Sequence, residues 1–198
     1  MSVRRLADET LQPKKFFFSS RNLVWAEKTI AQYPKNREQS AVIPLLMRVQ
    51  EQEGWITRAS IEYVATMLSM SYIRVLEIAT FYTQFHLRPL GTRAHIQVCG
   101  TTPCMLRGAE ELKKVCKKRI NGEPLITNAE GTLSWEEVEC LGACVNAPMV
   151  MIFKDTYEDL TPSRLEEIIV LFEEGLGESV PVGPQNGRFS SEPWMGEG

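Results

Sequence analysis

Apolar residues recur at helical spacing in the N-terminal half of the chain, up to about residue 82. Each of three runs fits one face of a helix: Val42, Leu45, Leu46 and Val49, then Ile61, Val64, Ala65 and Leu68, then Val75, Ile78, Ala79 and Tyr82. Typical helix-end residues separate the runs, because Gly54 can end the first helix and Thr57 and Ser71 can cap the next two. The pattern predicts a helical bundle over about residues 20–90.

After the turn at residues 89–91, apolar residues recur at every second position instead of at helical spacing. Residues 94–99 alternate, which predicts a strand that ends at Cys99. The two faces of this strand carry Ala94, Ile96 and Val98 on one side and His95, Gln97 and Cys99 on the other. After a loop, Thr102 and Pro103 suit the cap and first turn of a helix that runs to about Arg119. Its apolar face consists of Met105, Ala109, Leu112 and Cys116.

Shorter strands are predicted around residues 132–139 and 149–153, and a last helix from Thr161 and Pro162 to about residue 174. This order of elements is typical of an α/β or α+β domain. The remaining residues are too poor in consecutive apolar positions for a core, so we expect an extended arm. It is either a disordered terminus or a segment that becomes ordered along a partner, with Phe189 and Trp194 as anchors. The predicted divisions are an N-terminal extension (1–19), a helical domain (20–90), a cysteine-bearing domain (91–175) and the arm (176–198).

The charge balance argues against a nucleic-acid partner. With 22 basic and 25 acidic residues the net charge is −3, which offers no basic surface for a polyanion. Three short helices in succession also describe a helix-turn-helix module, but residues 38–90 contain four arginines, no lysine and five glutamates. A DNA-binding module needs a basic face, so packing against other protein surfaces is the better use of these helices.

No stretch approaches the ~18–20 consecutive apolar residues of a membrane span, and the cluster Phe16, Phe17 and Phe18 is too short for the core of a secretory signal. We therefore expect a cytoplasmic protein with no direct membrane insertion. In a reducing compartment, its five cysteines are expected to be free thiols or metal ligands rather than disulfides.

Four of the cysteines form two close pairs, Cys99-x4-Cys104 and Cys140-x3-Cys144. Each pair lies in a predicted loop beside a rigid element, where ligands commonly gather. Three kinds of site compete with ordinary buried thiols. A structural zinc site and a redox-active dithiol both favour Cys-x2-Cys, which neither pair has. A 2Fe-2S cluster tolerates wider spacing, since each of its two irons can take one pair, and it is the favoured alternative.

The cysteine pattern also carries a resemblance. The pairs, Pro148, and the segments Ser40-Ala-Val-Ile-Pro-Leu-Leu, Gln52-Glu-Gly-Trp55 and Ala79-Thr-Phe-Tyr82 resemble the 24 kDa subunits of respiratory complex I, the NADH:quinone oxidoreductase. The resemblance runs from about residue 20 to the C-terminus. The segment Gly183-Pro-Gln-Asn-Gly-Arg-Phe189 is similar to tails of that family. Related subunits of NAD-linked hydrogenases and formate dehydrogenases share the cysteine pattern and are the alternative.

The resemblance implies an α+β protein, with a helical bundle followed by a thioredoxin-like domain that holds one 2Fe-2S cluster. Cys99 and Cys104 would bind one iron, and Cys140 and Cys144 the other. The chain would be an electron-transfer subunit of the translocase, not catalytic alone, at the periphery of the inner membrane. Its partner would be the larger flavin subunit, which binds FMN and NADH, and the chain itself has no G-x-G-x-x-G loop.

Formal charges predict a low reduction potential for such a cluster. Two ferric ions, two sulfides and four thiolates sum to −2, so one electron makes the site −3. Glu136, Glu137 and Glu139 just before Cys140 add to the same effect. The reference value for an all-cysteine plant-type centre is roughly −400 mV. The cluster is therefore expected to carry one electron at low potential, with hydride chemistry left to the flavin.

Three further features are expected to be structural. Cys116 shares an apolar helical face, so we interpret it as a buried thiol. Rieske-type ligation needs two histidines paired with two cysteines, so His95 is expected to be a neighbour or surface residue rather than a ligand. The basic end of one helix, formed by Lys113, Lys114, Lys117, Lys118 and Arg119, is expected to be a solvated face rather than a docking patch.

Overall fold

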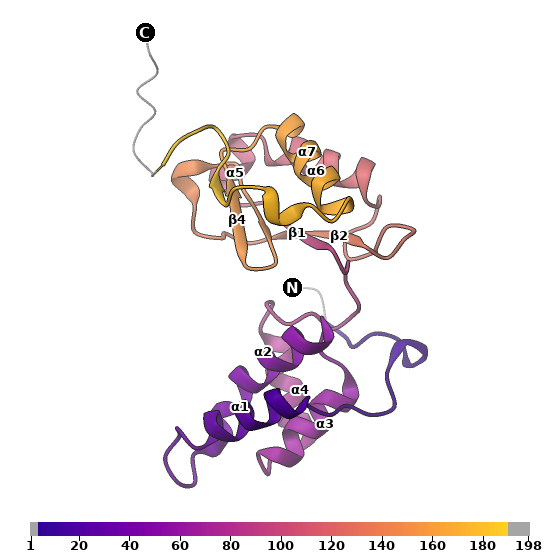
Figure 1. Ribbon diagram of the computed structural model, residues 1–198, viewed down its shortest axis with the longest axis vertical. Coiled ribbons are helices and arrows are strands. Elements are labelled where there is room, and N and C mark those ends of the chain that lie inside the picture. Colours follow the sequence, from indigo (N-terminus) through magenta and orange to yellow (C-terminus); the bar gives the residue numbers. More distant parts are fainter. Residues whose placement is uncertain (1–3, 190–198) are drawn as a thin grey trace. The chain divides into compact units, whose positions relative to one another are not determined.

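The computed structural model describes residues 4–189, and it divides the chain into two compact units, Met1–Pro89 and Leu90–Gly198 (Figure 1). Trp194, proposed above as an anchor, lies outside the described residues. Among the described residues, no helix is both long and apolar enough to cross a membrane.

The first unit is all-helical. Its elements are η1 (Glu9–Leu11), α1 (Ser20–Ile30), η2 (Glu38–Ala41), α2 (Val42–Glu53), α3 (Arg58–Met67) and α4 (Tyr72–Phe81). The predicted apolar faces form its core, in which Leu45, Val64 and Val75 are completely buried. Tyr82 differs from the prediction because α4 ends at Phe81, and the Tyr82 side chain is 40% exposed.

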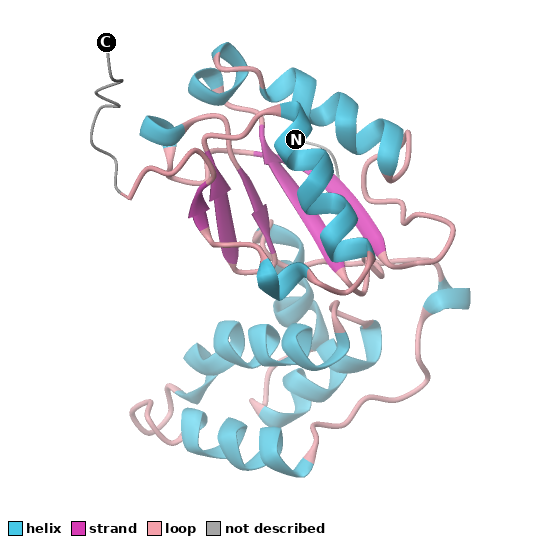
Figure 2. Cartoon of the chain, turned by 45° about the horizontal axis from the view of Figure 1, so that its top comes forward, coloured by secondary structure: helices cyan, strands magenta, loops and turns pink. Residues whose placement is uncertain are grey.

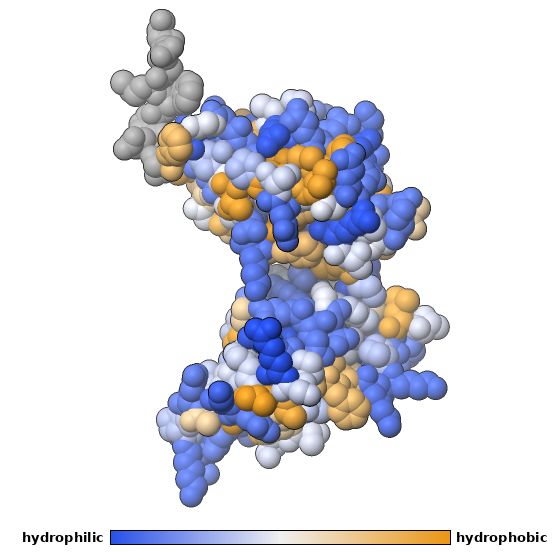
Figure 3. Space-filling view, viewed as in Figure 1, coloured by the Kyte–Doolittle hydropathy of each residue, from blue (hydrophilic) through white to orange (hydrophobic). Residues whose placement is uncertain are grey.

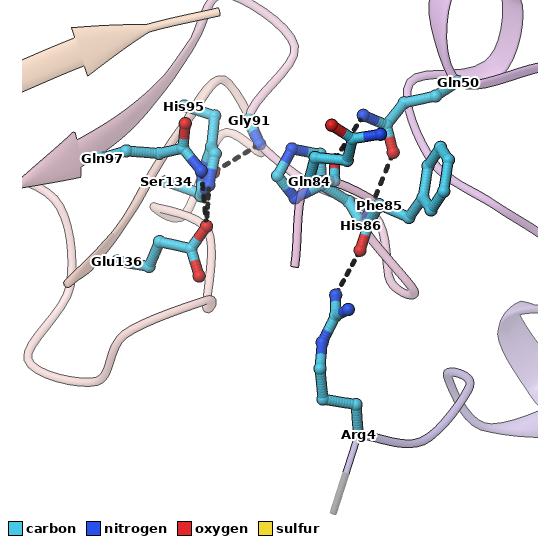
Figure 4. A network of polar contacts seen from close by, with 10 residues as sticks. All are labelled: Arg4, Gln50, Gln84, Phe85, His86, Gly91, His95, Gln97, Ser134 and Glu136. Atoms are coloured by element: carbon cyan, nitrogen blue, oxygen red, sulfur yellow. Dashed lines mark hydrogen bonds and ion pairs between the residues drawn. The ribbon is translucent and has the colours of Figure 1, made fainter. Parts of the chain in front are cut away.

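The described residues of the predicted N-terminal extension, 4–19, pack against this unit. Phe16 and Phe18 are buried, and both rings pack edge-on against Tyr63 of α3. Arg4 donates hydrogen bonds to the carbonyl oxygens of Tyr82 and Phe85, the second of which is drawn in Figure 4. Aromatic residues bury a large apolar area each, so two of them suffice to fix a segment that lacks any periodic pattern.

The ends of the helices follow the sequence signals, with one difference. Gly54 ends α2 in the left-handed conformation, at φ +82°. Thr57 caps α3 through a reciprocal pair of hydrogen bonds, in which its hydroxyl oxygen accepts the Ser60 N–H and the Ser60 hydroxyl oxygen accepts the Thr57 N–H. Ser71 precedes α4 as predicted, but its side chain accepts no cap hydrogen bond.

The second unit combines a mixed sheet with helices (Figure 2). Its elements are β1 (Ala94–Cys99), α5 (Thr102–Leu106), α6 (Ala109–Arg119), β2 (Leu133–Val138), η3 (Cys144–Asn146), β3 (Val150–Ile152), β4 (Asp155–Glu158), α7 (Pro162–Glu173), η4 (Gly177–Ser179) and β5 (Gly183–Pro184). The helical unit and the mixed sheet together confirm the α+β fold class.

The strand order is β2-β1-β3-β4-β5. β1 pairs with β2 in parallel and with β3 antiparallel, while β4 pairs antiparallel with β3 and in parallel with β5. All six residues of β1 are buried, as expected for a central strand. The core combines Ile96 and Val98 of β1 with Leu112 of α6 and Leu165 and Ile168 of α7.

Three elements differ from the sequence expectation. The predicted helix up to Arg119 is two helices, because Gly108 adopts φ +108°, a left-handed value that interrupts the helix between α5 and α6. The strands β4 and β5 were not predicted, and both are short. Through β5 the described part of the C-terminal arm joins the sheet, and Val180 joins the core.

The two Ser/Thr caps make a matched test of the helical unit. Thr57→Ala should lower the free energy of unfolding by about 1–2 kcal/mol, because it removes the hydroxyl oxygen that accepts the buried Ser60 N–H and keeps only the bond from the Thr57 N–H to the Ser60 hydroxyl. Ser71→Ala should change it by less than about 0.5 kcal/mol, because the exposed Ser71 hydroxyl caps nothing. Urea unfolding of the full chain measures both. Equal losses in the two variants would contradict the assignment of the caps.

Candidate functional site

The first cysteine pair lies where β1 ends. Cys99 is the last residue of β1 and Cys104 lies in the first turn of α5, and both are buried. The Cys99 sulfur is 3.3 Å from the hydroxyl oxygen of Thr101. Between the two elements, the Gly100 N–H donates to the carbonyl of Val138 at the end of β2. The loop of the first pair is thereby fixed to the strand that leads to the second.

The second pair lies on the loop that follows β2. Cys140 and Cys144 are exposed, and their sulfurs are 3.4 Å apart. Gly142 between them has φ +92°, a conformation that an L side chain would strain, and it lets the loop fold back on itself. The loop ends in the short helix η3, where the Asn146 N–H donates to the carbonyl of Ala143.

Parallel pairing of β1 with β2 brings the two loops together. In the register, Cys99 is the partner of Val138, and Cys140 follows Val138 by two residues. Parallel strands end at the same edge of a sheet, so both cysteine loops leave from one edge. The backbone of Leu141 reaches the Cys99 thiol, and Cys104 and Cys144 influence each other electrostatically. The structure thus gathers all four of the predicted site residues.

The buried pair is asymmetric in acidity. Burial opposes ionisation of Cys99, but hydrogen bonds from Thr101, from the Cys104 thiol and from the Leu141 N–H outweigh it and lower the pKa of Cys99. Burial raises the pKa of Cys104 to about 12, and the neighbouring Cys99 adds to the rise, against a hydrogen bond from the Met149 N–H. In the metal-free chain Cys99 is therefore the more readily ionised thiol of this pair.

Cys144 and Cys116 differ in the cause of their shifts. The hydrogen bond with Cys140 raises the pKa of Cys144, with smaller contributions from burial and from the charges of Cys140 and Cys99. Cys116 lies in the apolar core on α6, where burial raises its pKa to about 12. A fully buried thiol among apolar side chains has the environment of a structural residue, as the sequence predicted.

An ion pair joins α6 to β2 beside the loop that carries Cys99 and Cys104. Lys113 of α6 has a side chain only 12% exposed, and its ammonium lies 3.0 Å from the carboxylate of Glu137 and 2.5 Å from that of Glu110. Glu137 passes directly over Gly100, where an added Cβ would lie 2.0 Å from a carboxylate oxygen. The glycine beside Cys99 therefore provides the space for this carboxylate. Lys113 is a structural partner of the site and not part of a solvated face.

A buried polar network lies on the same side of β1 as Cys99. His95 is buried, with Nδ1 2.8 Å from the Ser134 hydroxyl and Nε2 3.1 Å from Glu136, which also accepts a hydrogen bond from Gln97 (Figure 4). The Gly91 N–H donates to Ser134 Oγ, so the Ser134 hydroxyl proton is available to His95 Nδ1. With the Ser134 hydroxyl donating to Nδ1, Nε2 is the ring nitrogen that donates to the Glu136 carboxylate.

The register of the sheet explains this network. His95 is paired with Ser134 and Gln97 with Glu136 across the parallel strands. Sequence reasoning placed His95 and Gln97 on one strand face but did not identify their partners. The alternating polar positions in residues 133–138 were the available signal, and using it required knowing that β1 and β2 pair. His95 is a hydrogen-bonded interior residue and not a surface residue.

Exposed apolar side chains follow two of the cysteines in the chain, Cys104 and Cys144. Leu106 and Val145 are 76% and 68% exposed, and Met105 is 46% exposed. They follow Cys104 and Cys144 directly in the chain. Figure 3 shows that apolar groups also reach the surface elsewhere in both units.

Comparison with known proteins agrees with this architecture. The sequence profile of thioredoxin-like 2Fe-2S ferredoxins matches residues 26–173. The chain belongs to this family. It is 72% identical to the NADH-quinone oxidoreductase E subunit 1 of Rhizobium meliloti (strain 1021) over 193 residues, which cover 98% of this chain and 70% of the relative. It is 50% identical to the NADH-quinone oxidoreductase E subunit of Rickettsia bellii (strain RML369-C), over 78% of this chain and 92% of the relative.

The fold also appears among solved structures of lower sequence similarity. A chain of an NAD+-reducing NiFe-hydrogenase in the air-oxidised state has a TM-score of 0.62 and 16% sequence identity, over 70% of this chain and 24% of that one. At this identity the match shows a shared fold alone. The resemblance of the sequence to the 24 kDa subunits is confirmed, since the chain belongs to the same family as these oxidoreductase subunits.

The differing environments of the thiols can be tested by alkylation. In the metal-free full chain at pH 8, iodoacetamide should modify exposed Cys140 and Cys144 first and Cys116 last. With a pKa of about 12, only roughly one part in ten thousand of Cys116 is thiolate at pH 8, and raising the pH increases that share. Mass spectrometry of timed samples measures the order, with the guanidinium-unfolded chain as control. Early modification of Cys116 would contradict its place in the core.

Proposed function

We propose that this chain carries one 2Fe-2S cluster on Cys99, Cys104, Cys140 and Cys144. It would serve as the thioredoxin-like electron-transfer subunit of an NADH:quinone oxidoreductase. The observation that carries the proposal is the gathering of these four thiols at the ends of two parallel strands. It is supported by membership of the thioredoxin-like 2Fe-2S ferredoxin family and by 72% identity to a subunit of such an oxidoreductase.

The donor set suits the cluster. Four thiolates in two pairs fit two irons, with Cys99 and Cys104 on one and Cys140 and Cys144 on the other. A structural zinc or redox-dithiol site is less well matched, because neither pair has the Cys-x2-Cys spacing. When bound, the cluster supplies reversible one-electron transfer.

The residues around the thiols would affect the proposed cluster in three ways. Hydrogen bonds from Thr101 and from the backbone N–H groups of Leu141 and Met149 stabilise negative charge on sulfur. Burial of Cys99 and Cys104 excludes water from one side of the site. The carboxylate of Glu137 adds negative charge beside Gly100, which disfavours reduction, and Lys113 offsets part of that charge. The balance favours a low potential.

The exposed pair is the side from which an electron can leave. Cys140 and Cys144 are exposed and flanked by the apolar Val145, so a partner can approach closely there. Because the chain has no glycine-rich phosphate loop, NADH and FMN would bind to the partner flavin subunit, and one electron at a time would pass between that flavin and this chain. Within the whole complex the chain would lie at the membrane periphery, on the cytoplasmic side.

The alternative is the corresponding subunit of an NAD-linked hydrogenase or formate dehydrogenase. The hydrogenase chain shares the fold at 16% identity, whereas the two quinone oxidoreductase subunits share 72% and 50% of residues. Sequence similarity therefore supports the quinone oxidoreductase over the alternative.

Single cysteine substitutions test the ligand set. Cys99→Ala, Cys104→Ala, Cys140→Ala or Cys144→Ala should each abolish or severely weaken the cluster, whereas Cys116→Ala should keep it. The measurements are iron and labile sulfide, about two of each per chain when the cluster is present, and the electron paramagnetic resonance of the dithionite-reduced protein. A wild-type chain without iron and sulfide after anaerobic reconstitution would overturn the proposal. Loss of the signal in Cys116→Ala would overturn the ligand assignment.

The composition of the native complex tests the assignment to the quinone oxidoreductase. Isolation of the tagged full-length chain from its own cells, followed by mass spectrometry, should recover a flavin subunit together with membrane-embedded subunits. A flavin subunit accompanied by a hydrogenase or formate dehydrogenase large subunit would favour the alternative instead.

A further inference from the structure

The C-terminal segment, residues 183–189, contacts the loop of the second cysteine pair. Arg188 donates a hydrogen bond of 2.7 Å from Nη1 to Oδ1 of Asn146. Asn146 ends the short helix that begins at Cys144, two residues away, and its side chain is buried. Sequence reasoning took this segment for part of an arm that is either disordered or becomes ordered along a partner. The structure gives it a contact within the chain itself.

The segment reaches the loop through local backbone geometry. β5 pairs with β4, and the Gln185 N–H extends this pairing by donating to the carbonyl of Glu158. The chain then turns at Asn186 and Gly187. The Asn186 side chain accepts the Arg188 N–H, and Gly187 has φ +83°, which an L side chain would strain. The Asn-Gly-Arg sequence is therefore what directs Arg188 toward Asn146.

Asn146 joins three parts of the unit. Its Nδ2 donates to the Glu158 carboxylate of β4 at 2.7 Å, and its carbonyl accepts the Asp159 N–H at 2.8 Å. Its own N–H donates to Ala143 inside the cysteine loop. With Oδ1 taken by Arg188, this one side chain uses both ends of its amide. The position of the cysteine loop therefore depends on the hydrogen bonds that hold Asn146.

The charges around Asn146 favour Arg188 at this place. Arg188 Nε lies 3.6 Å from Oδ2 of Asp159, and the two side chains are 15% and 9% exposed. Neither of these two atoms has a hydrogen-bond partner among the described residues, so their attraction is coulombic. Glu158 adds a second carboxylate on the other side of Asn146. Arg188 thus offsets the charge of Asp159 and donates to the same amide whose Nδ2 donates to Glu158.

We infer that Arg188 is a positioning residue for the cluster. Through Asn146 it holds the exposed loop with Cys140 and Cys144 in the geometry that retains iron. This inference rests on the ligand set proposed above. The exposed pair has no burial to fix it, in contrast to Cys99 and Cys104, so its loop requires contacts of this kind. The C-terminal segment serves cluster retention within the chain, whatever it contributes to assembly.

The test is the rate at which EDTA removes iron from the reconstituted full-length chain, followed by loss of visible absorption. Arg188→Gln should lose iron at least about tenfold faster than wild type, because it removes a charge-assisted hydrogen bond to a buried partner. Arg188→Lys should restore most of the retention, since an ammonium keeps the charge and can donate to Asn146. The unfolding temperature of each metal-free variant serves as a check on folding.

Arg164→Gln is the matched control. Arg164 also binds this segment, through two hydrogen bonds of 3.1 Å to Gln185, but its side chain makes no hydrogen bond to the cysteine loop among the described residues. It should lose iron at the wild-type rate. Wild-type retention in Arg188→Gln, or equal loss in Arg164→Gln, would overturn the inference. Should Arg188→Gln fail to fold, retention by Arg188→Lys no better than that of Asn146→Ala would overturn it as well. A wild-type chain that takes up no iron would instead refute the proposed function.

Discussion

The parallel pairing of β1 with β2 is the interaction on which the rest of the site depends. The two cysteine pairs are far apart in sequence, and only this pairing, with Cys99 opposite Val138, makes both loops leave one edge of the sheet. A parallel pair needs a long crossover, which α5 and α6 supply between the strands. The crossover also has to pack, and α6 does so with Leu112 and Cys116 in the core. The apolar face that includes Cys116 therefore serves the site indirectly, because it packs the crossover helix into the same core as the strand that ends at Cys99.

The site balances two opposed requirements on negative charge. Thiolates are needed for ligation, and burial of Cys99 and Cys104 works against them, so hydrogen bonds from Thr101 and backbone N–H groups must compensate. A low-potential centre, however, needs the surroundings to remain unfavourable to an added electron. In the proposed site, Glu137 above Gly100 would supply that bias and Lys113 would limit it. The salt bridge between α6 and β2 would thus set the charge near the first loop without contacting the proposed ligands.

The candidate site residues were more predictable from sequence than their geometry. The cysteine spacing is a local property, and it singled out four candidate ligands and set Cys116 apart before any fold was known. The helical faces were predictable for the same reason, since a period of 3.6 shows within a single segment. The features that the sequence did not predict depend on contacts between segments that are far apart in the chain. The partners of His95, the addition of β5 to the sheet and the burial of Phe16 and Phe18 all follow from such contacts. The break at Gly108 had a local signal, but helical spacing on both sides of it concealed the interruption.

The two cysteine pairs differ in what holds them, and this difference fits the work of a one-electron carrier. Cys99 and Cys104 lie in the interior, fixed by the strand, the helix and the packing beneath them. Cys140 and Cys144 are exposed, which suits the proposed electron transfer to another protein, because such transfer weakens steeply with the distance between the two centres. The cysteines of an exposed loop are not buried, so contacts between the loop and the rest of the domain must hold it in place. Asn146 does this with one buried amide that joins the loop to β4 and to Arg188. The open side of the site is therefore made rigid by a polar cluster, and the closed side by the apolar core.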